Sequence, residues 1–132
     1  LEDDGYGEEL LERLGLADKR GKLGRELSKG MQQKLSIACA MVHRPEVLIF
    51  DEPLVGLDPH AIKELKSIFR ELRADGRAVL ISTHMIDSVE DYWDVAHIMM
   101  NGEFAATRRA SETEGRDLED LFFAITEGGE QA

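Results

Sequence analysis

The sequence predicts an α/β protein built around a parallel sheet, and two observations carry this prediction. Two short apolar runs, VLIF at 47–50 and RAVLIST at 77–83, are typical of strands that are covered on both faces. Between them, residues 58–76 have the apolar spacing of a helix. A strand, a helix and a strand in this order predict a parallel pair joined by a right-handed crossover. Both strands therefore end at the same edge of the sheet.

The N-terminal third is predicted to be helical around a polar loop. Residues 7–14 suggest a short helix that Gly15 closes, and residues 18–26 form a basic loop interrupted by glycines. A second helix spans residues 31–44 and stops at Pro45. Apolar side chains three and four positions apart predict its buried face, which comprises Met31, Leu35, Ala38 and Val42. The single cysteine, Cys39, is expected to be a small core residue of this helix.

The helix between the two predicted strands has clear start and stop signals. Asp58 followed by Pro59 is typical of an N-cap with proline at the first helical position. Gly76 is expected to end this helix. Its buried stripe comprises Ile62, Leu65, Phe69 and Leu72.

The C-terminal third is predicted to contain a hairpin and a last helix. Residues 84–93 suggest a short helix, and residues 95–100 suggest a third strand. The Asn101-Gly102 pair predicts a hairpin turn into residues 103–107. A polar linker then precedes a helix at 117–126.

Composition narrows the class of protein. The 132 residues suffice for a single core, and no apolar run approaches the roughly 20 residues of a membrane span. A net charge of −11 argues against a broad surface for nucleic acid or anionic lipid. One cysteine without an intrachain partner favours a reducing, cytoplasmic setting.

Polar residues follow both predicted strands at the shared sheet edge. Asp51 and Glu52 follow the first strand, and Ser82, Thr83 and His84 end or follow the second. Open α/β sheets bind ligands in the crevice beyond such an edge. Each residue alone has an ordinary structural interpretation, as a solvated loop or a helix cap. Their order and spacing favour a functional site.

Four stretches together resemble the ATP-binding cassette (ABC) ATPases. LSKGMQ at 27–32 is similar to the family's signature motif, and VLIFDE at 47–52 to the Walker B strand with its following glutamate. GLDP at 56–59 is similar to the D-loop, and His84 to the switch histidine. The signature departs from the common Gly-Gly-Gln, having Lys-Gly-Met at 29–31, but phosphate contact is expected to survive. The resemblance extends from about residue 10 to residue 126.

The resemblance implies ATP and Mg²⁺ as cofactors. Asp51 would hold Mg²⁺ through water, Glu52 would orient and polarise the attacking water, and His84 would contact the γ-phosphate. A helix N-terminus with a hydroxyl donor suits a phosphate. The residues expected to serve nucleotide at the interface with a second subunit are Ser28, Lys29, Gly30, Gln32 and Asp58.

No Gly-x-x-x-x-Gly-Lys-Ser/Thr motif occurs in these residues. The resemblance therefore implies a C-terminal half: part of the helical subdomain at 1–44, the later part of a P-loop NTPase (RecA-like) core at 45–110, and a linker, helix and tail at 111–132. The N-terminal half of the same domain is an expected partner. The chain alone is expected to be inactive as an ATPase.

The implied parent is the ATPase subunit of an ABC transporter, which works as a homo- or heterodimer of nucleotide-binding subunits on a transmembrane permease subunit. That places it in the cytoplasm, on the inner face of the cell membrane. LEDLFFAIT at 118–126 is similar to the closing helix of many bacterial exporter subunits. Two alternatives stay open: an ABC-type ATPase of translation or DNA repair without a membrane partner, and a non-enzymatic interaction module.

Overall fold

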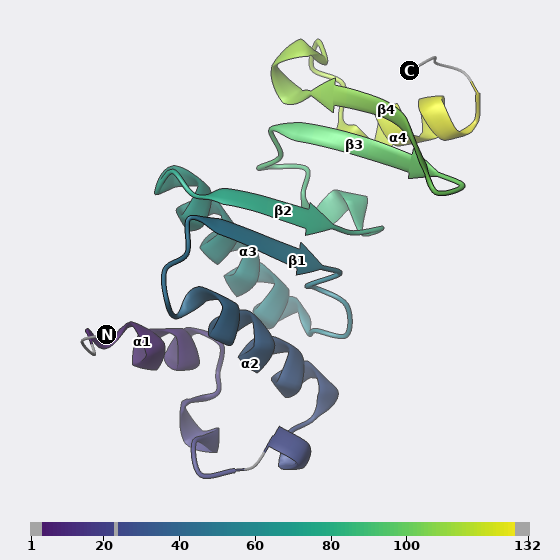
Figure 1. Ribbon diagram of the computed structural model, residues 1–132. Coiled ribbons are helices and arrows are strands. Elements are labelled where there is room, and N and C mark those ends of the chain that lie inside the picture. The colour runs from purple at the N-terminus through teal and green to yellow at the C-terminus, as the bar shows by residue number, and fades with distance from the viewer. Residues whose placement is uncertain (1–3, 23, 129–132) are drawn as a thin grey trace. The chain divides into compact units, whose positions relative to one another are not determined.

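The computed structural model describes residues 4–22 and 24–128, and they divide into two compact units (Figure 1). The first unit is Leu1–His84 and the second is Met85–Ala132. The predicted three-part division at residues 44 and 110 remains a prediction. Within the described ranges, no helix is long and apolar enough to cross a membrane.

The first unit contains the predicted parallel strand pair. β1 and β2 pair in parallel, from Val47 opposite Ala78 to Asp51 opposite Ser82. The crossover between them is α3, as predicted. The helices and strands of this unit, apart from two 3₁₀ turns at Ala17–Lys19 and Gly24–Glu26, are α1 (Tyr6–Arg13), α2 (Lys29–Met41), β1 (Val47–Asp51), α3 (Pro59–Ala74) and β2 (Ala78–Ser82).

The core of this unit lies between α3 and one face of the sheet. Leu48 and Phe50 of β1 are buried, and the Phe50 ring lies 5.2 Å from the ring of Phe69 on α3. Leu65 and Ile68 of α3 are also fully buried. This packing holds β1 against α3, and the sheet edge lies at the end of β1.

The expectation that the apolar runs are covered on both faces is wrong for the described residues. Burial alternates along β1, so that Val47 is 61% exposed and Ile49 is 71% exposed. Leu80, opposite Ile49 on β2, is 57% exposed. Successive strand side chains point to opposite faces, and only the face that carries Leu48 and Phe50 is packed into the core.

The buried face of α2 also differs from the predicted stripe. Ile37, Ala38 and Met41 are buried, whereas Val42 is exposed. Cys39 is exposed as well, so its assignment to the core was wrong. The true core row is therefore rotated around the helix from the predicted one.

The second unit is a hairpin covered by a helix. Its elements are a 3₁₀ turn η3 (Ile86–Ser88), β3 (Val95–Met100), β4 (Glu103–Arg109), a 3₁₀ turn η4 (Ala110–Glu112) and α4 (Leu118–Thr126). Asn101 and Gly102 both have positive φ, 53° and 78°, which confirms the predicted hairpin turn. Ile125 of α4 packs with Ile98 and Ala106 of the hairpin.

The helix predicted at 84–93 is wrong, since only the turn η3 forms there. The Ser88 hydroxyl donates to the Met85 carbonyl at 2.5 Å, and the Ser88 amide donates to the same oxygen. Local bonds of this kind compete with continued helix. Farther along, the Glu90 carboxylate accepts from the amides of Leu118 and Glu119 at the start of α4.

Candidate functional site

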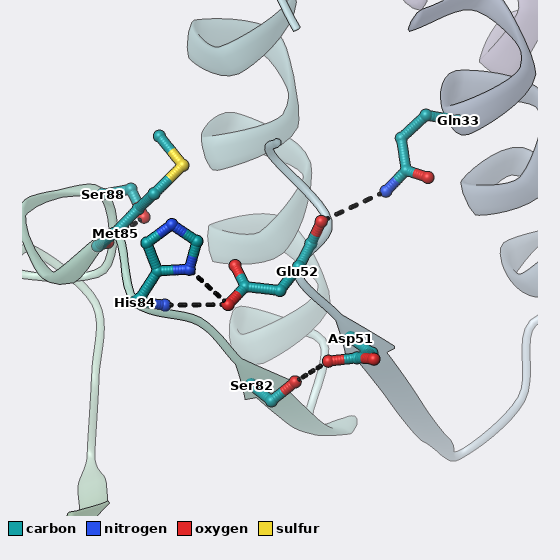
Figure 2. A network of polar contacts seen from close by, with 7 residues as sticks. All are labelled: Gln33, Asp51, Glu52, Ser82, His84, Met85 and Ser88. Atoms are coloured by element: carbon teal, nitrogen blue, oxygen red, sulfur yellow. Dashed lines mark hydrogen bonds and ion pairs between the residues drawn. The ribbon is translucent and has the colours of Figure 1, made fainter. Parts of the chain in front are cut away.

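The sheet edge at the ends of β1 and β2 brings the predicted polar residues together. Asp51 and Ser82 are register partners, and the Ser82 hydroxyl donates to Asp51 Oδ1 (Figure 2). The parallel pairing produces this contact, because neighbouring parallel strands end side by side. Both side chains are exposed at the edge.

Glu52 directly follows β1 and turns the chain away from the strand direction. Its φ is 47°, a left-handed conformation that costs a residue with a Cβ about 1–2 kcal/mol. The Glu52 amide donates to the Ser82 carbonyl at 2.8 Å, which extends the ladder by one bond. The turn therefore aims the Glu52 side chain differently from a strand residue at the same position.

The Glu52 carboxylate contacts His84. Oε1 accepts from the His84 amide at 3.1 Å and lies 2.7 Å from His84 Nδ1 (Figure 2). An ionised carboxylate can only accept, so Nδ1 donates in this contact and Nε2 is the ring nitrogen directed elsewhere. The His84 side chain is 78% exposed.

The second carboxylate oxygen of Glu52 has a different environment. Oε2 is buried and has no hydrogen-bond partner among the residues that the structure describes. Buried acceptors without a partner are rare and call for a bound water, ion or ligand. One oxygen of Glu52 thus fixes the carboxylate, and the other can accept from a further group.

The predicted signature residues open α2. Ser28 is the N-cap, and its Oγ accepts from the Met31 amide at 3.1 Å. Lys29 is exposed. A Cβ on Gly30 would lie 3.4 Å from the Gly56 carbonyl oxygen, at the close end of ordinary van der Waals contact, so the helix start lies near the loop after β1.

Gln32, expected to serve nucleotide, has its amide occupied within the chain. Its Nε2 donates to the carbonyls of Gly24 and Leu27, at 2.9 and 3.2 Å. These bonds hold the loop that leads into Ser28. A direct contact of Gln32 with nucleotide stays an untested prediction, and the structure assigns its amide to the loop.

Asp58 is the N-cap of α3, and its Oδ1 accepts from the Ala61 amide at 2.8 Å. The hydrogen bond from Ala61 lowers the pKa of Asp58 below its ordinary value, and the positive charge of Lys34 acts in the same direction. The carboxylate is exposed. The cap therefore favours the ionised form of Asp58.

Gln33 is a site residue that the sequence reasoning missed. Its Nε2 donates to the carbonyls of Glu52 and Pro53, at 3.3 and 3.1 Å. Gln33 lies one turn before Ile37 and two turns before Met41, on the row of α2 that is buried. The signal in the sequence was a polar residue on that row. It was missed because the buried face of α2 was predicted on a different row.

The residues at the sheet edge fit Mg²⁺ only together with a phosphate ligand. Asp51 is an exposed carboxylate beside a hydroxyl, which suits a contact to Mg²⁺ through water. Within residues 4–22 and 24–128, no group of three or more His, Cys, Asp or Glu side chains could hold a metal ion. Mg²⁺ commonly takes one or two carboxylates and completes its shell with water and substrate phosphates.

Comparisons with known proteins indicate which family the chain resembles. Residues 2–55 match the family described as ABC transporter. The chain is 44% identical over 105 residues to the octopine permease ATP-binding protein P of Rhizobium meliloti, covering 80% of the chain and 40% of the relative. It is 36% identical to the bacitracin transport ATP-binding protein BcrA of Enterococcus faecalis, covering 92% and 40%.

A solved structure gives the same result for the fold. The ATP-binding subunit of an ABC transporter superposes with a TM-score of 0.82 at 32% identity, covering 93% of this chain and 55% of that one. The chain spans less than half the length of the two curated relatives above.

Fold and sheet edge thus define part of a P-loop NTPase core. Over the residues that these matches cover, the chain is similar to ABC transporter ATP-binding proteins.

Proposed function

We propose that the parent protein hydrolyses ATP with Glu52 as the residue that polarises the attacking water. The observation that carries this proposal is the meeting of Asp51, Glu52 and His84 at one sheet edge. Glu52 Oε2 supplies a buried acceptor for a water proton, and Oε1 is held by His84. Asp51 supplies the carboxylate for Mg²⁺ through water.

His84 and the start of α2 take complementary roles in this proposal. His84 Nδ1 faces Glu52, so Nε2 is the nitrogen available for the γ-phosphate. The exposed N-terminus of α2 offers amide groups and the Ser28 hydroxyl to a phosphate. The family resemblance implies that this phosphate belongs to a nucleotide held by a second subunit. It also implies that Asp58 couples the two subunits across the same interface.

We further propose that these residues are the C-terminal half of the ATPase domain. Phosphoryl transfer needs a phosphate cradle, and the P-loop sequence is absent from the 132 residues. The relatives contain further sequence in which a P-loop can lie, because the chain matches only 40% of each. The N-terminal half of the domain is thus the first partner.

The remaining partners follow from the relatives. The names of two relatives, octopine permease ATP-binding protein P and bacitracin transport ATP-binding protein BcrA, refer to a permease and to transport. We therefore place the parent on a transmembrane permease subunit at the cytoplasmic face of the membrane, as a dimer of nucleotide-binding subunits. The similarity of residues 118–126 to the closing helix of bacterial exporter subunits favours export.

Isothermal titration with Mg-ATP tests the assignment to a C-terminal half. The 132-residue chain is expected to bind Mg-ATP only weakly, because the phosphate cradle and its lysine are absent. The full-length parent, titrated under the same conditions, is the matched control and is expected to bind much more tightly. Micromolar affinity in the chain alone would contradict the proposal.

A further inference from the structure

Gln33 connects the helix that begins with the signature residues to the backbone of Glu52. Its side chain donates through Nε2 to the Glu52 carbonyl (Figure 2). The same nitrogen also donates to the Pro53 carbonyl. These two carbonyls are consecutive along the chain and belong to the turn that carries the left-handed Glu52. A single NH₂ group therefore clamps the turn at two neighbouring points.

The position of Gln33 suits a clamp better than a solvated surface residue. Gln33 is partly buried, and it shares its helix row with the buried Ile37 and Met41. Packing along this row limits the freedom of the side chain. The two N–H donors of one amide satisfy two backbone acceptors, which is the full donor capacity of Gln33.

The clamp acts on an unfavourable backbone conformation. A residue with a Cβ seldom adopts positive φ unless its surroundings enforce it. On one side, the Glu52 amide is held by the Ser82 carbonyl. On the other side, the Glu52 and Pro53 carbonyls are held by Gln33. In this backbone conformation, the Glu52 carboxylate contacts His84.

We propose that Gln33 is a positioning residue that holds Glu52 in the conformation required to polarise water. The catalytic part of this inference rests on the proposed function, whereas the positioning part concerns contacts of the chain alone. Gln33 acts through the Glu52 backbone and touches neither nucleotide nor water in this account. Its loss is expected to slow the chemical step without weakening ATP binding.

The positioning can be tested without any activity measurement. The His84 amide donates to Glu52 Oε1, so its ¹⁵N–¹H resonance reports on the placement of that carboxylate. In the full-length protein, Gln33→Leu removes both donors at similar volume, and Gln33→Glu replaces the NH₂ with an acceptor. Both variants should move the His84 resonance. Ile37→Val, a core truncation on the same helix row, should leave it in place.

The turnover number kcat and the Kd for Mg-ATP are measured on the same variants. Misplacement of a reacting group by about 1 Å can cost on the order of 100-fold in rate, so kcat of the Gln33 variants should fall by about tenfold or more. The Kd for Mg-ATP should stay within about twofold of the wild-type value, since the clamp touches no nucleotide. Ile37→Val should retain kcat. Gln33→Glu, being nearly isosteric, provides the result if Gln33→Leu does not fold.

The possible outcomes distinguish the positioning role of Gln33 from the proposed ATPase function. An unmoved His84 resonance, or a kcat equal to that of Ile37→Val, would overturn the positioning role. A loss of kcat and of ATP affinity in equal measure would also overturn it. A shifted resonance in a full-length protein that neither binds nor hydrolyses ATP would uphold the clamp and refute the proposed function.

Discussion

Glu52 shows how one residue gains a special environment from its neighbours in the fold. Its backbone is left-handed, one carboxylate oxygen is held by His84, and the other is buried without a partner in the described structure. An ordinary loop glutamate would expose both oxygens to water. The sequence predicted the meeting of Asp51, Glu52 and His84, because parallel strands end together.

Other residue-scale features lay beyond sequence reasoning. The amide contacts of Gln32 and Gln33 go to backbone carbonyls in different parts of the chain, Gly24 and Leu27 for one and Glu52 and Pro53 for the other. Neighbouring glutamines on a helix look alike in sequence. Only the packing direction of the helix decides which of them reaches the sheet edge.

Asp58 provides a prediction of pH dependence at the residue scale. The Ala61 amide lowers the pKa of Asp58 below its ordinary value of 3.8 in the folded state. A lowered pKa stabilises the fold above the unfolded value, and this stability is lost as the pH falls through the folded value. Asp58→Asn keeps the cap but cannot titrate. Between pH 7 and pH 3, the unfolding free energy of the Asp58→Asn variant should therefore fall less than that of the wild type.

Urea unfolding at both pH values measures this difference. Asp87→Asn changes an exposed aspartate in the second unit and is the substitution control. An Asp58→Asn variant with the same pH dependence as the wild type would remove Asp58 from this role.

At the scale of elements, the sequence predicted most helices and strands from periodicity and end signals. Start signals such as Asp58-Pro59 and Asn101-Gly102 act locally, which is why they were reliable. The helix predicted at 84–93 failed because Ser88 closes a local turn on Met85. The prediction that β1 is covered on both faces was wrong, because periodicity identifies the apolar residues but does not show what covers them.

The N-cap of α4, Asp117, and a first-turn residue, Asp120, are both acidic and repel each other when ionised. Asp117 caps the helix by accepting from the Asp120 amide at 2.8 Å. The Asp117 charge raises the pKa of Asp120 above its ordinary value. A raised pKa in an acid means that the folded state loses stability as the pH rises above the unfolded value. The nearby Asp117 charge thus disfavours the ionised form of Asp120.

Asp120→Asn is therefore expected to stabilise α4 at pH 7 and to change little at pH 3. Amide exchange of residues 121–126 measures the effect, with slower exchange expected in the variant at neutral pH. Glu119→Gln removes a charge from the same turn without relieving the Asp117–Asp120 repulsion, and it should give no such protection. Faster exchange in Asp120→Asn at pH 7 would contradict the account.

At the scale of the whole chain, both units expose apolar sheet residues. On the first unit they are Val47, Ile49 and Leu80, and on the second they are Val95, Met99 and Phe104. In the described residues, the sheets are the two-stranded pairs β1–β2 and β3–β4. Small sheets with exposed apolar side chains and unpaired edges recruit other chains.

The isolated chain is therefore expected to form dimers or larger assemblies, or to bind hydrophobic dyes as a loosely packed monomer. Light scattering gives the mass, and dye fluorescence gives the exposed apolar surface. The full-length parent is the control and should bind less dye. A compact monomer that binds no dye would show that these faces are covered within the chain itself.

The central claim is that Glu52 is the catalytic carboxylate of an ATPase, and Glu52→Gln in the full-length parent tests it most directly. The substitution keeps the size of the side chain and an acceptor for His84 but removes the charge. A general base contributes about 10²–10⁴-fold, so turnover should fall by about 100-fold or more while Mg-ATP stays bound and intact. Glu119→Gln is the control and should turn over at the wild-type rate. Near-normal turnover in Glu52→Gln would contradict the claim.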